Sequence, residues 1–136
     1  MSVERPTKDV QVGDEMPDGT IYAGISPDTH KPMYATPRDA PLTYTFNQAQ
    51  DTYAAQLNAH GRKDWRVPTK NELNVLYENR NKGKLAGTFN ETGSYPAGWY
   101  WSSSQYRDNY KWVQSLSNGD QNIGHRDFFA SLRCVR

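Results

Sequence analysis

The side chains that could carry out catalysis or hold a metal ion are scattered along this chain. His30, His60 and His125 stand apart from one another, and neither a His-x-His nor a His-Glu-x-x-His spacing occurs. Zinc sites draw on several closely spaced Cys and His ligands, but Cys134 is the only cysteine in the sequence. The sequence therefore predicts no metal ion and no other cofactor.

Nucleophilic and acidic residues also lack a catalytic context. Ser102–Ser104 lie in the stretch YWSSSQ and not in the Gly-x-Ser-x-Gly turn that presents a catalytic serine. Asp14, Glu15 and Asp18 do not follow the spacing of a calcium-binding loop. Cys134 has no histidine nearby in the sequence, so we predict a buried and inert thiol. We assign no catalytic residue, and an enzyme is the least favoured class of function.

Recognition of a ligand by contact fits the last part of the chain better. Residues 98–136 combine large aromatic rings with Ser, Asn, Asp, Gly and Arg. Tyr and Phe offer rigid contact area, and Asn, Asp and His adapt their hydrogen bonds, a mixture typical of antibody paratopes. We predict that one exposed face binds the ligand through Tyr106, Asp108, Asn109, Tyr110, Asn122, His125, Asp127, Phe128 and Phe129.

Two features of this set concern its geometry. The two segments flank the dipeptide Asn118-Gly119, a strong signal for a tight turn between strands, so strand pairing would bring them side by side. Phe128 and Phe129 are adjacent, and neighbouring residues of a strand point to opposite sides. We therefore expect at least one of the two phenylalanines to be exposed.

Two helices are expected ahead of this surface, each starting with a capping box. Thr45–Gln48 would begin the first helix, which should end near Gly61, and Thr69–Glu72 would begin the second, which should end near Asn81–Gly83. The apolar stripes that face the core would be Phe46, Ala49, Tyr53 and Leu57 in the first helix, and Leu73, Leu76 and Tyr77 in the second.

Short strands are expected on either side of the helices. Thr20–Ile25 and Pro32–Thr36 read as strands joined by a turn, and Leu132–Arg136 reads as a closing strand. Period-two patterns surround Trp101 and Trp112, and we expect these two tryptophans and Trp65 to be largely buried. Strands, two helices and then a strand-rich C-terminal half with long irregular loops predict an α+β fold.

The overall charge excludes some classes of partner. Lys and Arg number 16 against 15 Asp and Glu, and the formal net charge is +1, which argues against nucleic acid and against anionic membranes. No apolar run reaches membrane-spanning length, so we expect no membrane insertion. The first residues, MSVERPTKDV, lack the apolar core of a signal peptide. We expect cytoplasmic synthesis, while a place in a phage particle or on the cell surface by another route, and oligomer formation, stay open.

Four segments of the chain resemble one bacterial family. They are DWRVPTKNELNVLY at Asp64–Tyr77, GWYWSSSQY at Gly98–Tyr106, KWVQSLSNGDQN at Lys111–Asn122 and LRCVR at Leu132–Arg136. In this order they resemble the Lcl C-terminal domain family, found in collagen-like adhesins and in bacterial surface and phage proteins. The resemblance covers roughly residues 45–136, after strands and turns over residues 1–44. It implies one domain over residues 1–136 with a C-type-lectin-like fold.

The resemblance implies a fold but names no ligand. Formylglycine-generating enzymes are similar in fold, but their chemistry needs paired cysteines and this chain has one. The Glu-Pro-Asn, Gln-Pro-Asp and Trp-Asn-Asp signatures of calcium-dependent C-type lectins are missing. Any ligand binding is therefore expected to be calcium-independent.

Some members of this fold are variable proteins of diversity-generating retroelements. In these proteins randomised adenines turn Asn codons into codons for many residues, but never for Trp, Lys, Gln, Glu or Met. Tyr106–Tyr110 and Asn122–Arg133 contain none of these five types. Fixed scaffold positions would then be Lys111, Trp112, Gln114 and Gln121. The exposed loops of an ordinary adhesin are the alternative explanation.

Two functions thus stay open for the chain. The favoured one is a non-catalytic ligand-binding module that presents its C-terminal surface, diversified or not, to a protein or glycan. The alternative is a structural or assembly subunit of a phage particle or a bacterial surface structure.

Overall fold

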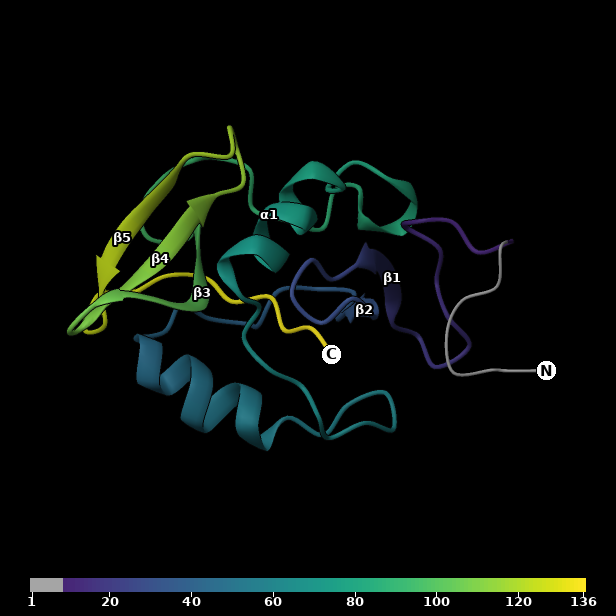
Figure 1. Cartoon of the computed structure of the whole chain (residues 1–136), viewed down its shortest axis with the longest axis horizontal. Coiled ribbons are helices and arrows are strands. Elements are labelled where there is room, and N and C mark those ends of the chain that lie inside the picture. The colour runs from purple at the N-terminus through teal and green to yellow at the C-terminus, as the bar shows by residue number, and fades with distance from the viewer. Residues whose placement is uncertain (1–8) are drawn as a thin grey trace.

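A computed structural model describes residues 9–136 as a mixed α+β fold with two helices and two antiparallel sheets, which confirms the predicted class. The two-stranded sheet pairs β1 with β2, and the three-stranded sheet has the order β3-β4-β5. Figure 1 shows helix α1 between the two sheets. The strands are β1 (Ile21–Ile25), β2 (Pro32–Ala35), β3 (Trp99–Arg107), β4 (Tyr110–Ser115) and β5 (Gln121–His125).

The first predicted helix forms, with a different winding from the one expected. The Thr45 hydroxyl accepts a hydrogen bond from the Gln48 amide at 3.4 Å, and the Gln48 side-chain oxygen accepts one from the Thr45 amide at 3.1 Å. From Gln48 to Ala54 the segment is a π-helix, η1. The helical residues end at 56, before Gly61, and the chain then reverses through a turn in which His60 and Gly61 have φ angles of 57° and 72°.

The second predicted helix is α1 (Lys70–Glu78), and its capping box between Thr69 and Glu72 is confirmed. Leu73 and Leu76 are buried as predicted. The helix ends at Glu78, earlier than expected, because Asn79 leaves helical geometry and its side chain donates a hydrogen bond to the Ala23 carbonyl of β1 at 3.0 Å. A short 3-10 turn, η2 (Gly83–Leu85), follows.

The C-terminal segment is not the closing strand that the sequence predicts. Ala130 bridges Tyr44, Ser131 bridges Tyr100, and Val135 bridges both Ala35 and Arg66. Because its successive residues pair with four different parts of the chain, the segment never runs along one partner for long enough to become a strand. In Figure 1 it is the yellow trace that passes between the two sheets to the C-terminus.

Two apolar cores meet at the three-stranded sheet. Tyr100 belongs to the core formed with α1 and with strands β1 and β2, whereas the next residue, Trp101, belongs to the core formed with Phe46, Ala49 and Ala54 of the first helix. The C-terminal segment contributes to both, since Val135 lies in the first core and Leu132 in the second. Both faces of β3 are therefore covered at its start.

The predicted burial of the tryptophans is confirmed for two and wrong for the third. Trp65 is 4% exposed and Trp101 is 1% exposed, but Trp112 is only half-buried. The Trp112 ring lies on the face of β4 that carries α1, where the Lys70 side chain and the Tyr106 ring lie against it. Trp112 pairs with Ile123 of β5, and its neighbour Val113, not Trp112, belongs to the core around Trp101.

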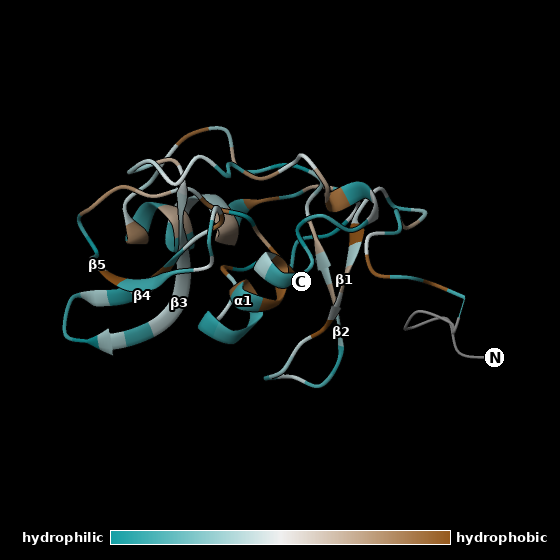
Figure 2. Cartoon of the chain, turned by 90° about the horizontal axis from the view of Figure 1, so that it is seen from above, coloured by the Kyte–Doolittle hydropathy of each residue, from teal (hydrophilic) through white to brown (hydrophobic). Residues whose placement is uncertain are grey.

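The end of the β3–β4 hairpin that lies far from α1 is polar. Figure 2 shows this end mainly in the colour of hydrophilic residues. Between residues 9 and 136 no helix has the length and apolar character needed to cross a membrane.

Candidate ligand-binding surface

The tip of the β3–β4 hairpin and the loop after β5 are joined directly. Arg107 pairs with Tyr110 across the turn formed by Asp108 and Asn109, and Asn109 takes a left-handed conformation with φ of 64°. The Asn109 carbonyl accepts a hydrogen bond from the Arg126 amide at 2.8 Å. The two predicted ligand-binding segments therefore lie side by side.

Strand pairing arranges aromatic side chains along one face of the sheet. Tyr110 is opposite His125, and Trp112 is opposite Ile123, so these side chains share a face. This is the face on which α1 lies, because the Gln114 side-chain amide donates to the Asn74 side-chain oxygen of α1 at 2.8 Å. Beyond the end of α1 the face is open.

The rings form a series that we call the aromatic row, in which ring contacts join all neighbours except Tyr106 and Tyr110, which the Arg107 side chain links. In order across the surface its members are Trp112, Tyr106, Tyr110, His125, Phe128 and Tyr95. Ring centroids lie 5.4 Å apart for Trp112 and Tyr106, 5.2 Å for Tyr110 and His125, 5.9 Å for His125 and Phe128, and 6.5 Å for Phe128 and Tyr95.

Two cationic side chains, Arg107 and Lys70, contact rings of the aromatic row. The Arg107 guanidinium lies 5.7 Å from the Tyr106 ring centroid and 5.5 Å from that of Tyr110, and so links the two rings. The Lys70 ammonium lies 3.7 Å from the Trp112 centroid. Cation–π contacts of this kind hold rings in place at a surface.

Much of the aromatic row is open to solvent. Tyr106 is 49% exposed, Phe128 53% and Tyr95 62%, while Tyr110, His125 and Trp112 are half-buried between them. Large exposed rings at neighbouring positions mark interaction sites on soluble proteins. The aromatic row therefore begins on the face of the sheet that carries α1 and continues around the edge of the sheet, where Phe128 and Tyr95 also line a depression on the opposite face. A ligand could cover its exposed rings at this edge.

The remaining predicted residues lie off the aromatic row. Asp108 and Asn109 line a polar pocket of about 470 Å³ together with Lys111 and Arg126. Asn122 lies on the opposite face of β5 and lines a small apolar depression of about 190 Å³ with Phe128 and Phe129. The nine residues therefore surround the outer end of the sheet and do not share one flat face.

Asp127 and Phe129 belong to the loop after β5. The Asp127 amide donates to His125 Nδ1 at 3.1 Å, and the Asp127 carboxylate lies 3.6 Å from the same nitrogen. Phe129 donates its amide to the Tyr95 hydroxyl at 3.2 Å and is 46% exposed. The prediction that at least one of the two phenylalanines is exposed is confirmed, and in fact both are.

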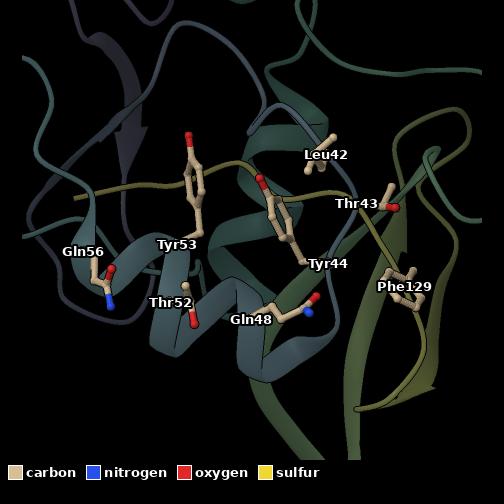
Figure 3. A pocket seen from close by; sticks show the side chains of 8 residues that line it. All are labelled: Leu42, Thr43, Tyr44, Gln48, Thr52, Tyr53, Gln56 and Phe129. Carbon is tan, nitrogen blue, oxygen red and sulfur yellow. The ribbon is translucent and has the colours of Figure 1, made fainter.

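Sequence reasoning missed several members of this surface. Tyr95 lies in an irregular loop with no periodicity, and only its contacts with Phe128 and Phe129 bring it to the site. For Arg107 the sequence offers no indication of a place in this surface other than its positive charge. A further pocket, beside Tyr44 and Tyr53, was missed because Tyr53 fits the apolar stripe of a helix (Figure 3).

The motif Trp-Arg-Val-Pro at residues 65–68 connects α1 to β3, the strand that carries Tyr106. Arg66 donates two hydrogen bonds to the Glu72 carboxylate, at 2.5 and 2.9 Å, and the Ser26 hydroxyl donates a third at 2.6 Å. The Pro68 carbonyl accepts from the Ser103 amide of β3 at 2.8 Å. This motif fixes α1 against β3.

The charge of Glu72 is stabilised by these partners. Burial of the carboxyl group alone would raise its pKa, but the hydrogen bonds from Arg66 and Ser26 outweigh burial and lower the pKa below its ordinary value. The Arg66–Glu72 pair is thus a scaffold element that joins the segment before α1 to the start of the helix.

The motif Leu-Arg-Cys-Val-Arg at residues 132–136 is also scaffold. Arg133 is fully buried, and its guanidinium donates to Asp39 at 2.9 Å, to the Thr36 carbonyl at 3.1 Å and to the Thr88 carbonyl at 2.6 Å. The Tyr100 hydroxyl donates to the same Asp39 carboxylate. These bonds tie the C-terminal segment to β3 and to two loops.

Neither a metal site nor a reactive thiol stands out. Across residues 9–136 no group of three or more His, Cys, Asp or Glu side chains is arranged to hold a metal ion. Cys134 is buried, and this burial raises the pKa of its thiol to about 12.

The model of the Lcl C-terminal domain family matches residues 25–136. No curated protein matches the chain. The match begins earlier than the resemblance expected from residue 45, and the structure shows why: Tyr34 of β2 exchanges backbone hydrogen bonds with Arg136, so the first sheet is part of the same unit.

Proposed function

The chain belongs to the Lcl C-terminal domain family, and from this we propose that it is a non-catalytic ligand-binding module which presents the aromatic row to a protein or glycan ligand. The observation that carries the proposal is the aromatic row, in which Arg107 links Tyr106 to Tyr110 and ring contacts continue from Tyr110 to Tyr95. Exposed rings on a surface without a partner favour aggregation. A ligand that covers these rings would account for their exposure.

The binding energy should concentrate in few positions. Rings with little side-chain freedom lose little entropy on binding, and the contacts of Arg107 and His125 already restrict Tyr110 and its neighbours. The polar groups at the margin, such as Asp108 and Asn109, would add hydrogen bonds and specificity.

A C-type-lectin-like fold and retroelement diversification are part of the proposal. Residues 106–109 are exposed, as variable positions would be, and Gln114, which we expect to be fixed, is buried and hydrogen-bonded. Of the other positions expected to be fixed, Lys111 and Trp112 are half-buried and Gln121 is exposed. Ala130–Arg133 are buried, however. Diversification in the second segment would therefore be confined to residues 122–129.

The proposal is tested by a binding screen of two proteins that differ only in the aromatic row. The labelled wild type and the variant Tyr106→Ala/Tyr110→Ala/Phe128→Ala are applied to a glycan array and to a displayed random-peptide library. We expect calcium-independent hits for the wild type that the variant loses, while thermal unfolding of the two proteins stays similar.

Two outcomes would contradict the proposal. Hits kept in full by the triple variant would place the binding site elsewhere. Wild-type protein that finds no hit and instead forms a defined oligomer, which the triple variant cannot form, would favour the alternative function of an assembly subunit.

A further inference from the structure

Another pocket lies beside the first helix, and of its lining residues Phe129 adjoins Phe128 and Tyr95 of the aromatic row. The pocket has a volume of about 560 Å³, within the range of small-molecule sites. Figure 3 shows its side chains: Tyr44 and Tyr53 stand next to each other, with residues of the helix on one side and of the Leu42–Tyr44 loop on the other. We call it the tyrosine pocket, lined by Leu42, Thr43, Tyr44, Gln48, Thr52, Tyr53, Gln56 and Phe129.

The π-helical winding of η1 shapes the tyrosine pocket. In an α-helix Gln48 and Tyr53, five residues apart, would point about 140° away from each other. In a π-helix the i→i+5 hydrogen bonds bring residues five apart close to the same line. Gln48, Thr52 and Tyr53 can thus all line one pocket. Such π-helical turns are rare and frequently occur at functional sites.

The two tyrosines form the apolar part of the pocket. Their ring centroids lie 5.4 Å apart with an angle of 37° between the ring planes. The Tyr44 backbone is held by two hydrogen bonds, because its carbonyl accepts one from Trp101 Nε1 at 2.7 Å and one from the Ala130 amide at 3.0 Å. These bonds fix the Tyr44 backbone at the pocket, and the Tyr53 ring packs beside the Tyr44 ring.

The polar groups of the pocket are neutral and have unused hydrogen-bonding capacity. None of the eight lining residues is charged. Among residues 9–136, the side chains of Thr43, Thr52 and Gln56 and the hydroxyls of Tyr44 and Tyr53 have no hydrogen-bond partner. Gln48 uses its oxygen for the cap, and its NH₂ group has no partner in the same range. Donors and acceptors thus border an aromatic surface.

From this geometry we propose that the tyrosine pocket binds one neutral sugar unit. A pyranose ring has an apolar face of C–H groups, which suits the negative faces of the tyrosine rings. Its hydroxyls are both donors and acceptors and match the free amides and hydroxyls around the pocket. A charged sugar would find no counter-ion here, and a wholly apolar ligand would leave these polar groups buried without partners. This site is separate from the aromatic row and does not depend on the proposed function.

The test is an NMR titration of the wild type with methyl glycosides of glucose, galactose, mannose and N-acetylglucosamine, alongside glucuronate and uridine. We expect at least one neutral glycoside to shift the Gln48 and Gln56 side-chain amide signals and the η1 backbone signals, with a dissociation constant of about 1–10 mM, usual for weak ligands. Glucuronate and uridine should leave these signals unchanged.

Variants locate the site. Thr52→Ala/Gln56→Ala removes two exposed side chains without partners, so folding should be unaffected, and we expect affinity to fall about tenfold or more. Gln50→Ala removes an exposed glutamine of the same helix outside the pocket, and Tyr106→Ala removes a ring of the aromatic row; both should bind as the wild type does.

The proposal is overturned if no neutral glycoside shifts these signals, or if glucuronate or uridine does so in their place. Equal affinities of Thr52→Ala/Gln56→Ala and Gln50→Ala for the same glycoside would overturn it as well. A loss of glycoside binding in Tyr106→Ala would assign the sugar to the aromatic row and not to this pocket.

Discussion

At the scale of single residues, burial separates the scaffold from the binding surface. Gln114 and Arg133 are polar or charged, yet both are buried. Tyr95, Tyr106 and Phe128 are large and apolar by type, yet all three are exposed. This reversal of the usual preference is informative, because buried polar groups and clustered exposed rings both need a specific reason.

Cys134 should be inert in the native protein. With a thiol pKa of about 12, the thiolate fraction at pH 8 is only on the order of 10⁻⁴, and burial keeps reagents out. We expect labelling by a thiol reagent to be slow without denaturant and fast in denaturant. Fast stoichiometric labelling of the native protein would contradict the buried position.

The two tryptophans of the three-stranded sheet should differ in their contribution to stability. Trp101→Ala empties a fully buried site and should lower the free energy of unfolding by about 3–5 kcal/mol. Trp112→Ala removes a half-buried ring and should cost about 1–2 kcal/mol. Chemical denaturation of both variants measures the difference. Equal losses would mean that the Trp112 ring is covered as well as that of Trp101.

At the scale of elements, the helix starts could be predicted and their windings and ends could not. A capping box is local, since Thr69 and Glu72 lie three residues apart, and the sequence is enough to find it. The end of α1 depends on a bond between Asn79 and Ala23, far apart in the chain. The π-helical winding of η1 likewise has no signal in the residue types.

The start of α1 should be acid-sensitive. Hydrogen bonds lower the pKa of Glu72 below its ordinary value of 4.5 in the folded protein. The ionised carboxylate therefore adds stability that is fully present above pH 4.5 and is lost as the pH falls through the lower folded pKa. Glu72→Gln should lose this contribution at all pH values, leaving Arg66 without its charged partner.

This is measured by urea unfolding of the wild type and of Glu72→Gln at several pH values. We expect the free energy of unfolding of Glu72→Gln to lie about 3 kcal/mol below that of the wild type near pH 7, and we expect this gap to narrow below about pH 4. A gap that stays constant down to pH 2 would show that Glu72 is not the group responsible.

At the scale of the whole molecule, the C-terminal segment holds the parts together. It pairs with the first sheet, the second sheet and the segment before α1. The sequence indicated a strand here, because a run of apolar residues with alternating polar ones fits one. Its actual partners, four segments distant in sequence, follow from the packing of the two cores and leave no local pattern. For the same reason Tyr95 and the tyrosine pocket could not be predicted.

Arg133 of the C-terminal segment forms an ion pair with Asp39 inside the fold. Asp39→Ala should leave the fully buried guanidinium without its counter-ion and lower the free energy of unfolding by about 3–5 kcal/mol. The double variant Asp39→Leu/Arg133→Met should recover part of this loss, since a buried ion pair can be replaced by apolar groups. Chemical denaturation of the wild type, Asp39→Ala and the double variant measures these changes. A loss below about 1 kcal/mol in Asp39→Ala would contradict a structural role for the ion pair.

The most direct test of the account is the affinity of single variants of the aromatic row for the strongest hit of the array and library screen. Phe128→Ala and Tyr106→Ala should each weaken binding at least tenfold, as expected for central aromatic contacts, with little change in melting temperature. Ile25→Ala removes an exposed apolar side chain of β1, on the other sheet, and should bind like the wild type. Unchanged affinity in Phe128→Ala and Tyr106→Ala, or an equal loss in Ile25→Ala, would contradict the assignment of ligand binding to the aromatic row.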